Sequence, residues 1–312
     1  MKDSWKSHKH WLNVVLSISC LAWLSSQMQW SQVKAIWSTL SWWHFSAALS
    51  VPLFMSIVHV WRWQAATAFV GETITFNLGF RLVYIGYLFN QLLPSSFGGD
   101  VIRTWAMRKE GYTWPVSLGS VLLDRIVGLF TLTGLYVLLY PLIRHWLLLS
   151  ALDWVWGVLA LSWLGLITVV MTRSWWRKWV TGIAQGRLDW LHKLELPGTQ
   201  LFLALTCGCV VHFGIGLSFY ILASGLSIPL PLITALVLFP LINLITMVPL
   251  SFAGWGVREG VMMFALPHIG ILPEQAFALS VSYGVVLTIS ALPGVLVWWF
   301  APTERLKTKI SS

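Results

Sequence analysis

Long apolar stretches, broken at intervals by short polar segments, dominate the pattern along this chain of 312 residues. A helix needs about 20 predominantly apolar residues to cross the ~30 Å hydrocarbon core of a bilayer. By that measure the pattern predicts six full transmembrane helices, near residues 11–29, 43–62, 115–143, 151–172, 199–224 and 275–300. The alternation typical of an outer-membrane barrel is missing. We therefore expect an all-α integral membrane protein, with one transmembrane domain over residues 1–312.

Two further apolar stretches, residues 81–93 and 231–248, are shorter. Each is ended by a proline, Pro94 or Pro249, and is followed by a second short helical segment. Paired broken helices in corresponding halves of a chain are typical of transporter binding sites. We interpret both stretches as re-entrant helical hairpins.

A ten-residue pattern marks the tips of these hairpins. Residues 94–103 read PSSFGGDVIR and residues 249–258 read PLSFAGWGVR, with proline, serine, phenylalanine, glycine and arginine identical at five positions. The repeat predicts two related units, residues 43–143 and residues 199–300. Chance similarity is the alternative, because proline, serine and glycine are common at any helix break.

Composition and charge agree with a membrane location. The chain is 57% hydrophobic and 10% charged, and its formal net charge of +9 is spread in short basic clusters between the apolar segments. With a cytoplasmic N-terminus, sixteen lysines and arginines, Arg62 and Arg103 among them, lie inside, and only Lys34 and Arg144 lie outside. This asymmetry predicts a multi-pass membrane protein with both termini inside and hairpins that enter from opposite faces. The distribution of the basic residues is thus explained by membrane topology, and no nucleic-acid partner is expected.

The linker at residues 173–196 mixes tryptophans with basic residues at helical spacing. It predicts an amphipathic helix on the cytoplasmic leaflet, in contact with anionic lipids. A solvated topology anchor without lipid specificity is the alternative.

The tips offer groups that bind anions. At each tip a serine is expected to cap the second half-helix, and glycines let an oxygen approach the free amides. Close helix packing is the other use of such glycines. Arg103 and Arg258 follow Ser96 and Ser251 by seven residues, or two turns.

Charged residues in apolar segments are the remaining candidates. Asp124 and Arg125 each cost about 2.5–3.5 kcal/mol inside a membrane, so they default to a functional hypothesis. A structural network, joining Asp124 to Arg103 and Arg125 to Glu259, is the alternative. Asp100 is expected to pair with Arg103 three residues on, and Glu259 to need a partner other than its neighbour Arg258.

The uncharged polar residues are expected to have simpler roles. Asn90 and Asn243 precede the two prolines and either satisfy freed backbone groups or contact ligand. His59 and His212 are expected to be hydrogen-bonded core residues. No catalytic constellation, metal site or cofactor is predicted, since the three cysteines lie in apolar runs and no metal-ligand motif occurs. The candidate substrate-binding residues are Asn90, Ser95, Ser96, Gly98, Gly99, Asp100, Arg103, Asp124, Arg125, Asn243, Ser251, Gly254, Arg258 and Glu259.

Three motifs resemble the transmembrane region of lysylphosphatidylglycerol synthases and the related flippase-like membrane proteins. They are residues 90–100 with Arg103, residues 122–128, and residues 249–259. The resemblance implies a helical bundle, able to assemble as a homodimer, that moves a polar-headgroup lipid between the leaflets of the bacterial cytoplasmic (inner) membrane. It places Asp100, Arg103, Asp124, Arg125, Arg258 and Glu259 around the cavity. The soluble aminoacyl-transferase domain of the full synthases is missing, so no synthase activity is expected.

Two other functions stay open from the sequence. One is a membrane-embedded lipid-modifying enzyme with Asp100 or Asp124 as general acid or base. The other is an accessory subunit of an envelope lipid or glycan transferase.

Overall fold

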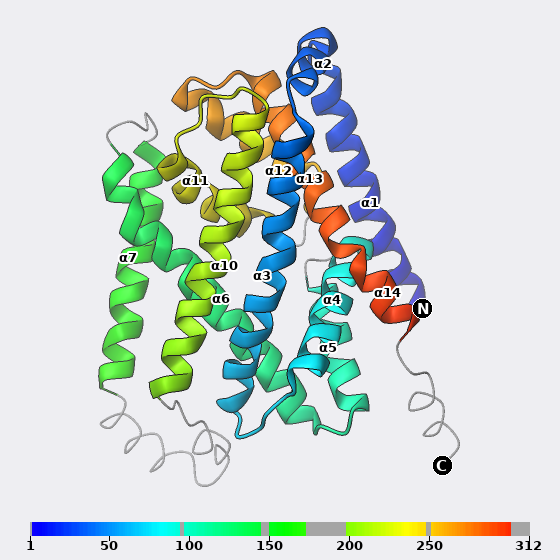
Figure 1. The fold of residues 1–312 in the computed structure, drawn as a ribbon, viewed down its shortest axis with the longest axis vertical. Coiled ribbons are helices and arrows are strands. Elements are labelled where there is room, and N and C mark those ends of the chain that lie inside the picture. Colours follow the sequence, from blue (N-terminus) through cyan, green and yellow to red (C-terminus); the bar gives the residue numbers. More distant parts are fainter. Residues whose placement is uncertain (1, 94–96, 145–149, 173–197, 248–250, 301–312) are drawn as a thin grey trace.

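The computed structural model describes residues 2–93, 97–144, 150–172, 198–247 and 251–300, which contain helices and no strand (Figure 1). The first part of the chain forms α1 (Lys2–Ser26), α2 (Trp30–Ser38), α3 (Trp42–Ala68), α4 (Phe76–Leu92), α5 (Gly98–Lys109), α6 (Trp114–Ile143) and α7 (Ser150–Met171). The second part forms α10 (Gly198–Gly225), α11 (Leu232–Thr246), α12 (Val257–Ala265), the 3-10 helix η1 (Leu266–Ile269), α13 (Pro273–Ala291) and α14 (Pro293–Trp299).

Four helical segments within the described residues are long and apolar enough to cross a membrane, namely Trp42–Ala68, Trp114–Ile143, Gly198–Gly225 and Pro273–Trp299. Four of the predicted spans are thereby confirmed as long apolar helices. The spans predicted at residues 11–29 and 151–172 are helical in α1 and α7, where the described apolar parts, Val14–Ser26 and Leu152–Gly165, are shorter. The count of six full spans stays a prediction, and the linker at residues 173–196 lies outside the described residues.

Local sequence signals explain where the helices of the first part begin. Ser41 caps α3 by accepting a hydrogen bond from the backbone N–H of His44, and Thr75 caps α4 in the same way with Leu78. Pro115 stands in the first turn of α6, where its missing N–H costs nothing.

Helices α3 and α10 pack closely because small residues face each other. A Cβ at Gly214 would lie 2.5 Å from the sulfur of Met55, so any larger residue there would require the Met55 side chain to move. One turn further along α10, the Ser218 hydroxyl donates to the carbonyl of Ala48 at 2.7 Å. This contact joins the two parts of the chain along their length.

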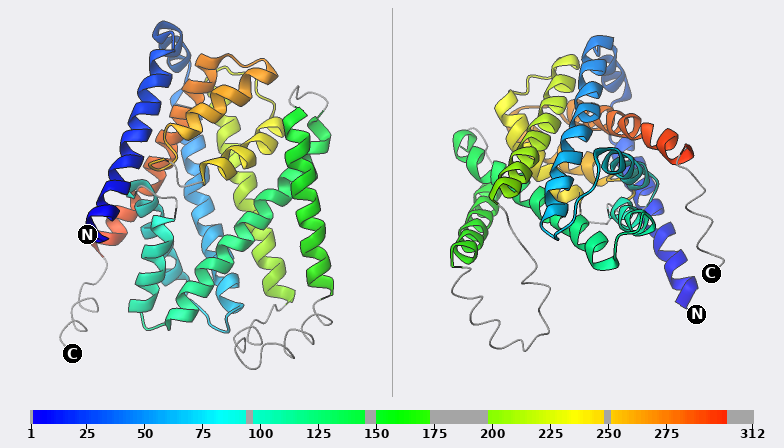
Figure 2. Two further views of the ribbon diagram at one scale, coloured as in Figure 1. Left: turned by 180° about the vertical axis from the view of Figure 1, so that it is seen from behind. Right: turned by 60° about the horizontal axis from the view of Figure 1, so that its bottom comes forward.

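The two proline-ended stretches each form the first helix of a pair. Helix α4 packs against α5, and α11 packs against α12. Figure 1 shows α4 and α5 in the lower half of the molecule and α11 and α12 in the upper half. Helix α6 crosses obliquely between the pairs and contacts both α5 and α11, as Figure 2 shows from behind. That the pairs are re-entrant hairpins of an inverted repeat stays a prediction.

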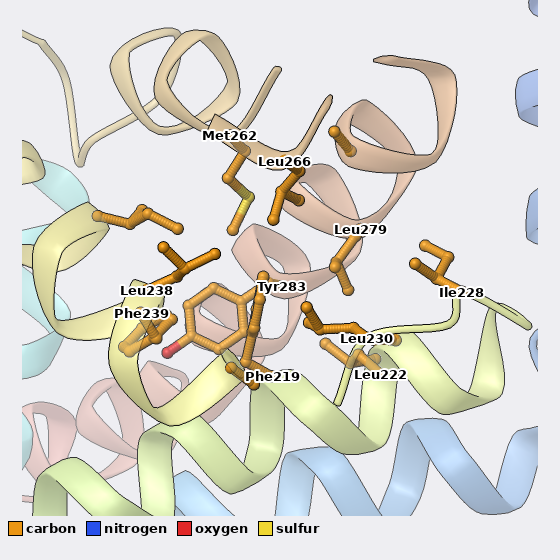
Figure 3. Close-up of a cluster of buried hydrophobic side chains, with 14 of the residues drawn as sticks. Phe219, Leu222, Ile228, Leu230, Leu238, Phe239, Met262, Leu266, Leu279 and Tyr283 are labelled. Carbon is orange, nitrogen blue, oxygen red and sulfur yellow. The ribbon is translucent and has the colours of Figure 1, made fainter. Parts of the chain in front are cut away.

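Each pair has its own hydrophobic core. Trp63, Val83 and Met107 are fully buried where α3, α4 and α5 meet. Around α11 and α12, Tyr283 stacks edge-on against Phe239, with ring centroids 5.1 Å apart (Figure 3). The two cores hold the pairs as separate packed units on either side of α6.

Helix α1 runs along the outside of the bundle and contacts α12 (Figure 1). The Ser17 hydroxyl on α1 accepts a hydrogen bond of 2.7 Å from the backbone N–H of Phe252. A Cβ at Gly256 would lie 3.1 Å from that of Cys20. The first helix therefore supports the segment that leads into α12.

Candidate functional site

Asp124 on α6 is the centre of a buried charge cluster. Its Oδ1 accepts a hydrogen bond of 2.8 Å from Nε of Arg62, and its Oδ2 lies 3.0 Å from Nε2 of His59. Both terminal guanidinium nitrogens of Arg103, Nη1 and Nη2, approach Oδ2 at 3.4 Å. The carboxylate is fully buried, so these contacts replace the water that it lacks.

Three helices converge to build this cluster. His59 and Arg62 are three residues apart on α3 and therefore share a face. Arg103 comes from α5, where its guanidinium lies over the ring of Trp63 with 4.0 Å to the centroid. Helix α4 makes room for it with Gly86, where a Cβ would lie 2.6 Å from Cδ of Arg103.

Asp100 extends the cluster toward the centre of the molecule. Its Oδ2 accepts a hydrogen bond of 2.5 Å from Nε of Arg125, and its Oδ1 lies 3.6 Å from a guanidinium nitrogen of Arg103. Arg125 follows Asp124 on α6, so the helix presents the two charges on different faces. Charges thus alternate from Arg62 through Asp124, Arg103 and Asp100 to Arg125. We call these five residues, with His59, the first charge cluster.

A second charge cluster surrounds Arg258 on α12. Glu259 Oε1 accepts a hydrogen bond of 2.9 Å from Arg258 and another of 2.9 Å from the Ser280 hydroxyl on α13. Glu259 Oε2 accepts a bond of 2.6 Å from the backbone N–H of Gly256. The guanidinium lies 4.8 Å from the ring centroid of Trp255. This cluster consists of Arg258, Glu259, Ser280 and Trp255.

A cavity lies between the two clusters. Its volume is about 170 Å³, and it takes Arg125 from the first cluster and Arg258 from the second. Its walls come from the end of α4, from α6, from α11, from the start of α12 with the segment before it, and from α13. They are formed by Asn90, Gln91, Arg125, Phe239, Ile242, Asn243, Thr246, Met247, Ala253, Gly254, Arg258, Tyr283 and Leu287. The cavity therefore brings together groups from both helix pairs.

Comparison with known protein families identifies the family of this chain. A family model described as the lysylphosphatidylglycerol synthase TM region matches residues 10–294, which is most of the chain. The chain belongs to that family. No curated protein matches it as a relative. The protein is thus a multi-pass membrane protein of a family related to lipid handling.

The structure gathers five of the candidate residues at the cavity wall: Asn90, Arg125, Asn243, Gly254 and Arg258. Four others stand behind the wall in the two clusters: Asp100, Arg103, Asp124 and Glu259. Ser95 and Ser96 lie outside the described residues. Their role in binding stays a prediction.

The predicted serine cap is wrong for α12. The residue that precedes this helix is Gly256, at φ +88°, and the carboxylate of Glu259 caps it. Arg258 is therefore in the first turn of α12, not two turns along it. Ser251 lies earlier in the chain, buried, and its hydroxyl has no hydrogen-bond partner among the described residues. A glycine can adopt this backbone conformation without strain, which moves the start of the helix past the serine.

Two of the amides expected to bind an anion are occupied by side chains. The N–H of Gly99 donates to Oδ1 of Asn90 at 2.8 Å, and that of Gly256 donates to Glu259. A Cβ at Gly99 would lie 2.1 Å from the carbonyl oxygen of Gly86, and one at Gly98 would lie 2.6 Å from Cβ of Leu93. Close packing, the alternative use, is what these two glycines provide.

The predicted ion pairs are partly right. The pair of Asp124 with Arg103 and that of Asp100 with Arg103 are confirmed. Arg125 pairs with Asp100 rather than with Glu259. Glu259 forms an ion pair with the preceding residue, Arg258. The long side chain of Arg258 can reach round the helix to the carboxylate of the next residue, which the ~100° between neighbouring residues does not reveal.

The sequence did not reveal most of what helix α3 contributes to the first charge cluster. Arg62 was expected at the cytoplasmic end of a span, yet it is buried beside Asp124. His59 bridges Asp124 and the hydroxyl of Tyr87, which lies 2.7 Å from its Nδ1. The available signal was the spacing of His59 and Arg62 on one face of an otherwise apolar helix. His212 is a hydrogen-bonded core residue as expected, with its Nε2 2.9 Å from the carbonyl oxygen of Gly128.

Metal binding finds no support in the described part of the chain. No group of three or more histidine, cysteine, aspartate and glutamate side chains converges there. The chemistry that the arrangement offers is electrostatic: guanidinium groups and side-chain amides around a cavity.

Proposed function

We propose that this protein translocates a polar-headgroup lipid, one that bears phosphate, between the leaflets of the bacterial cytoplasmic membrane. The observation that carries the proposal is the cavity that Arg125 and Arg258 both line. Guanidinium groups are the side chains best suited to phosphate, because their paired N–H donors match its oxygens. Asn90 and Asn243 add uncharged side-chain amides to the same wall.

The size of the cavity supports binding of a headgroup and not of a whole lipid. At about 170 Å³ it is smaller than the ~300–1,000 Å³ typical of sites that enclose a small molecule. Acyl chains gain nothing by leaving the hydrocarbon for a protein cavity, since both are apolar. Only the polar moiety needs a path of its own.

Burial of the charges supports a functional role. Arg62, Arg103 and Arg258 are each at least nine-tenths buried among apolar helices. Charges at such positions are costly and are retained mainly along substrate paths. A headgroup crossing the bilayer needs such an environment.

We further propose that the two helix pairs are re-entrant hairpins that enter from opposite faces, with both termini cytoplasmic. In that arrangement the units at residues 43–143 and 199–300 rock against each other and open the cavity to one leaflet at a time. A homodimer and contacts between the linker at residues 173–196 and anionic lipids are parts of the same proposal. Labelling of single cysteines at positions 97 and 252 tests the topology: full aqueous exposure of both on the same cell surface would contradict it.

A lipid-modifying enzyme is the less favoured proposal. Its general acid or base would be Asp100 or Asp124, and neither carboxylate lines the cavity. Each is held by guanidinium groups of the first charge cluster. Mass analysis of lipids incubated with the protein tests this alternative, since any new covalent product would favour it. Co-purification tests the accessory-subunit alternative.

Leaflet exchange in vesicles tests the main proposal. The purified protein is reconstituted with fluorescent phospholipids, and a membrane-impermeant quencher reports how much label reaches the outer leaflet. Arg125→Gln and Arg258→Gln are each expected to slow exchange at least about tenfold, because a phosphate then loses a charged partner. Arg81→Gln is the control, because Arg81 pairs with Glu110 away from the cavity. Folded protein that exchanges no phospholipid, polyprenyl phosphate or hopanoid would refute the proposal.

A further inference from the structure

His59 belongs to a hydrogen-bonded chain that the proposed headgroup site does not use. Its Nδ1 lies 2.7 Å from the hydroxyl of Tyr87 on α4, and its Nε2 lies 3.0 Å from Oδ2 of Asp124 on α6. Between two guanidinium groups the Asp124 carboxylate is ionised and only accepts hydrogen bonds. The neutral ring therefore carries its hydrogen on Nε2 and accepts the Tyr87 O–H at Nδ1, the nitrogen that can take up a further proton.

Tyr87 connects this ring to the side of α4 that reaches the cavity. His59 is buried, whereas Tyr87 is partly exposed. Asn90 and Gln91 line the cavity three and four residues further along α4, and residues at these spacings share a helix face. A proton can reach Nδ1 by way of the hydroxyl. Tyr87 transfers its own proton to the ring and takes a new one in its place, so that only the ring gains a charge.

The groups around the ring decide what the added proton does. Asp124 attracts a charged ring, and Arg62 and Arg103 repel it. On α13, Tyr283 faces Arg258 in the second charge cluster. The titratable and charged groups of the described residues that face the ring or its partners are Asp124 on α6, Arg103 on α5, Tyr84 and Tyr87 on α4, His212 and Cys207 on α10, and Arg62 on α3 itself.

Arg103 is the least firmly held partner of Asp124. Its Nη1 and Nη2 stand 3.4 Å from Oδ2, the oxygen that the ring also contacts, whereas Arg62 holds Oδ1 at 2.8 Å. Hydrogen bonds between charged groups are usually about 2.7–2.9 Å long. The Nε of Arg103 has no hydrogen-bond partner among the described residues. A positively charged His59 ring is therefore expected to take Oδ2 from Arg103.

A second carboxylate lies within reach of Arg103. Oδ1 of Asp100 is 3.6 Å from Nη1 of Arg103 and accepts no hydrogen bond in the described part of the chain. Oδ2 of the same carboxylate accepts from Nε of Arg125, which lines the cavity. The guanidinium of Arg103 can thus occupy two discrete positions, on Asp124 or on Asp100. The second position changes how Asp100 holds Arg125.

We propose that His59 is a proton-binding site, and that proton uptake there moves Arg103 from Asp124 to Asp100 and so couples the passage of the lipid to a proton. The inference rests on the proposed function and supplies its energy source. The charge beside Asp124 stays constant in the exchange, because the ring gains one positive charge as the guanidinium leaves. Through Asp100 the exchange reaches Arg125 at the cavity wall.

Nitrogen NMR of detergent-purified protein with isotope-labelled histidine tests the proton site without any lipid transport. The His59 signals are identified by their loss in His59→Gln. Wild-type protein should show the Nε2–H tautomer at high pH and a doubly protonated ring on acidification. Arg103→Gln removes the competing cation, so its ring should bind the proton at least about tenfold more tightly. Arg81→Gln, which breaks an ion pair outside the cluster, should leave proton binding unchanged.

Two results of this titration would overturn the proton site. One is a His59 ring that stays neutral in Arg103→Gln over the whole pH range in which the protein remains folded. The other is equal proton affinity in Arg103→Gln and wild type.

The guanidinium signals of labelled arginine test the exchange in the wild-type protein itself. The Arg103 signal should shift over the same pH range as the His59 ring, and in His59→Gln it should stay constant. Asp100→Asn removes the second acceptor, so its ring should bind the proton less tightly than that of wild type. An Arg103 signal that does not follow the ring would overturn the exchange, since repulsion alone would then explain the effect of Arg103→Gln.

Vesicles with a pH difference across the membrane test the coupling to lipid. The protein is reconstituted with fluorescent phosphatidylcholine, and potassium with valinomycin holds the membrane potential at zero. A one-proton coupling allows up to about tenfold enrichment of the label in one leaflet for ~1 pH unit, and we expect at least about threefold. His59→Gln should lose this enrichment. His212→Gln, which replaces the other buried histidine, should keep it.

Failure of the coupling differs from failure of translocation. Wild-type protein that exchanges the label but distributes it evenly under the pH difference would overturn the coupling and leave translocation supported. Protein whose His59 ring and Arg103 signal titrate together, but which exchanges no lipid, would defeat the proposed function and leave the proton site supported.

Discussion

The arginines that end the two copies of the repeated pattern are stabilised in different ways. Arg103 reaches across from α5 to Asp124 on α6, where Arg62 from α3 also binds. Arg258 pairs with the next residue of its own helix, and Ser280 supplies one hydrogen bond from α13. The first arrangement ties three helices to one carboxylate, and the second is almost complete within α12. The same sequence pattern therefore supports a shared network in one half and a local pair in the other.

This difference has a consequence for how the halves respond to change. In the first charge cluster a single substitution affects several buried charges at once. In the second cluster a single substitution affects only the guanidinium group of Arg258 and the N-terminus of α12. The expected effects below follow that order.

The largest effect is expected for Asp124→Asn. It leaves Arg62 and Arg103 buried without their common carboxylate. Breaking a buried pair in this way costs about 3–5 kcal/mol, so the thermal unfolding midpoint of the detergent-purified protein should fall strongly. Glu110→Gln, which breaks a partly exposed pair with Arg81, is the matched control and should change little. A midpoint unchanged by Asp124→Asn would show that the first cluster is not a shared network.

The next largest effect is expected when the glycine common to both copies of the pattern is replaced. Gly99→Ala places a Cβ 2.1 Å from the backbone oxygen of Gly86 and should cost about 2–3 kcal/mol by forcing α4 and α5 apart. At the corresponding Gly254, the nearest atom to a new Cβ is Cβ of Thr246 at 3.7 Å. Gly254→Ala therefore meets only the strain of its φ of +81°, about 1–2 kcal/mol. Thermal unfolding of both variants should rank them in this order, and the reverse ranking would contradict the packing of α4 against α5.

A smaller effect is expected for Glu259→Gln. The amide oxygen of glutamine can still accept from the N–H of Gly256, but Arg258 loses the charge of its partner. We expect a loss of about 1–2 kcal/mol in the free energy of unfolding, less than for Asp124→Asn. If Glu259→Gln proved the more damaging of the two, the second cluster would have to connect more helices than the contacts show.

The smallest effect is expected for Ser280→Ala. It removes one hydroxyl donor from Glu259 and leaves the pair with Arg258 in place. The expected loss is about 0.5–1.5 kcal/mol, measurable as a small shift of the unfolding midpoint. A double-mutant cycle with Glu259→Gln should show coupling between the two, while a cycle with Asp124→Asn should be additive.

Much of the candidate site could be predicted because charges in apolar segments are rare. Asp124, Arg125 and Arg258 stand out for that reason, and the structure places each in a cluster or at the cavity wall. His59 is a hydrogen-bonded core residue as expected, but its contact with Asp124 was not predicted. Arg62 was not recognised, because it was expected at the end of its span. Their importance depends on which helix faces α3, and periodicity within one helix cannot specify its neighbour.

By itself, the sequence determined that the chain is a helical membrane protein with two interrupted segments and a few charged residues inside apolar ones. Apolar length, proline and the cost of buried charge are local properties, so they can be recognised along the chain. Tertiary structure alone decided that Arg125 contacts Asp100, that Glu259 caps its own helix, and that the two clusters meet at one cavity. These outcomes depend on where long side chains from different helices converge, because a guanidinium can reach several carboxylates and packing selects one.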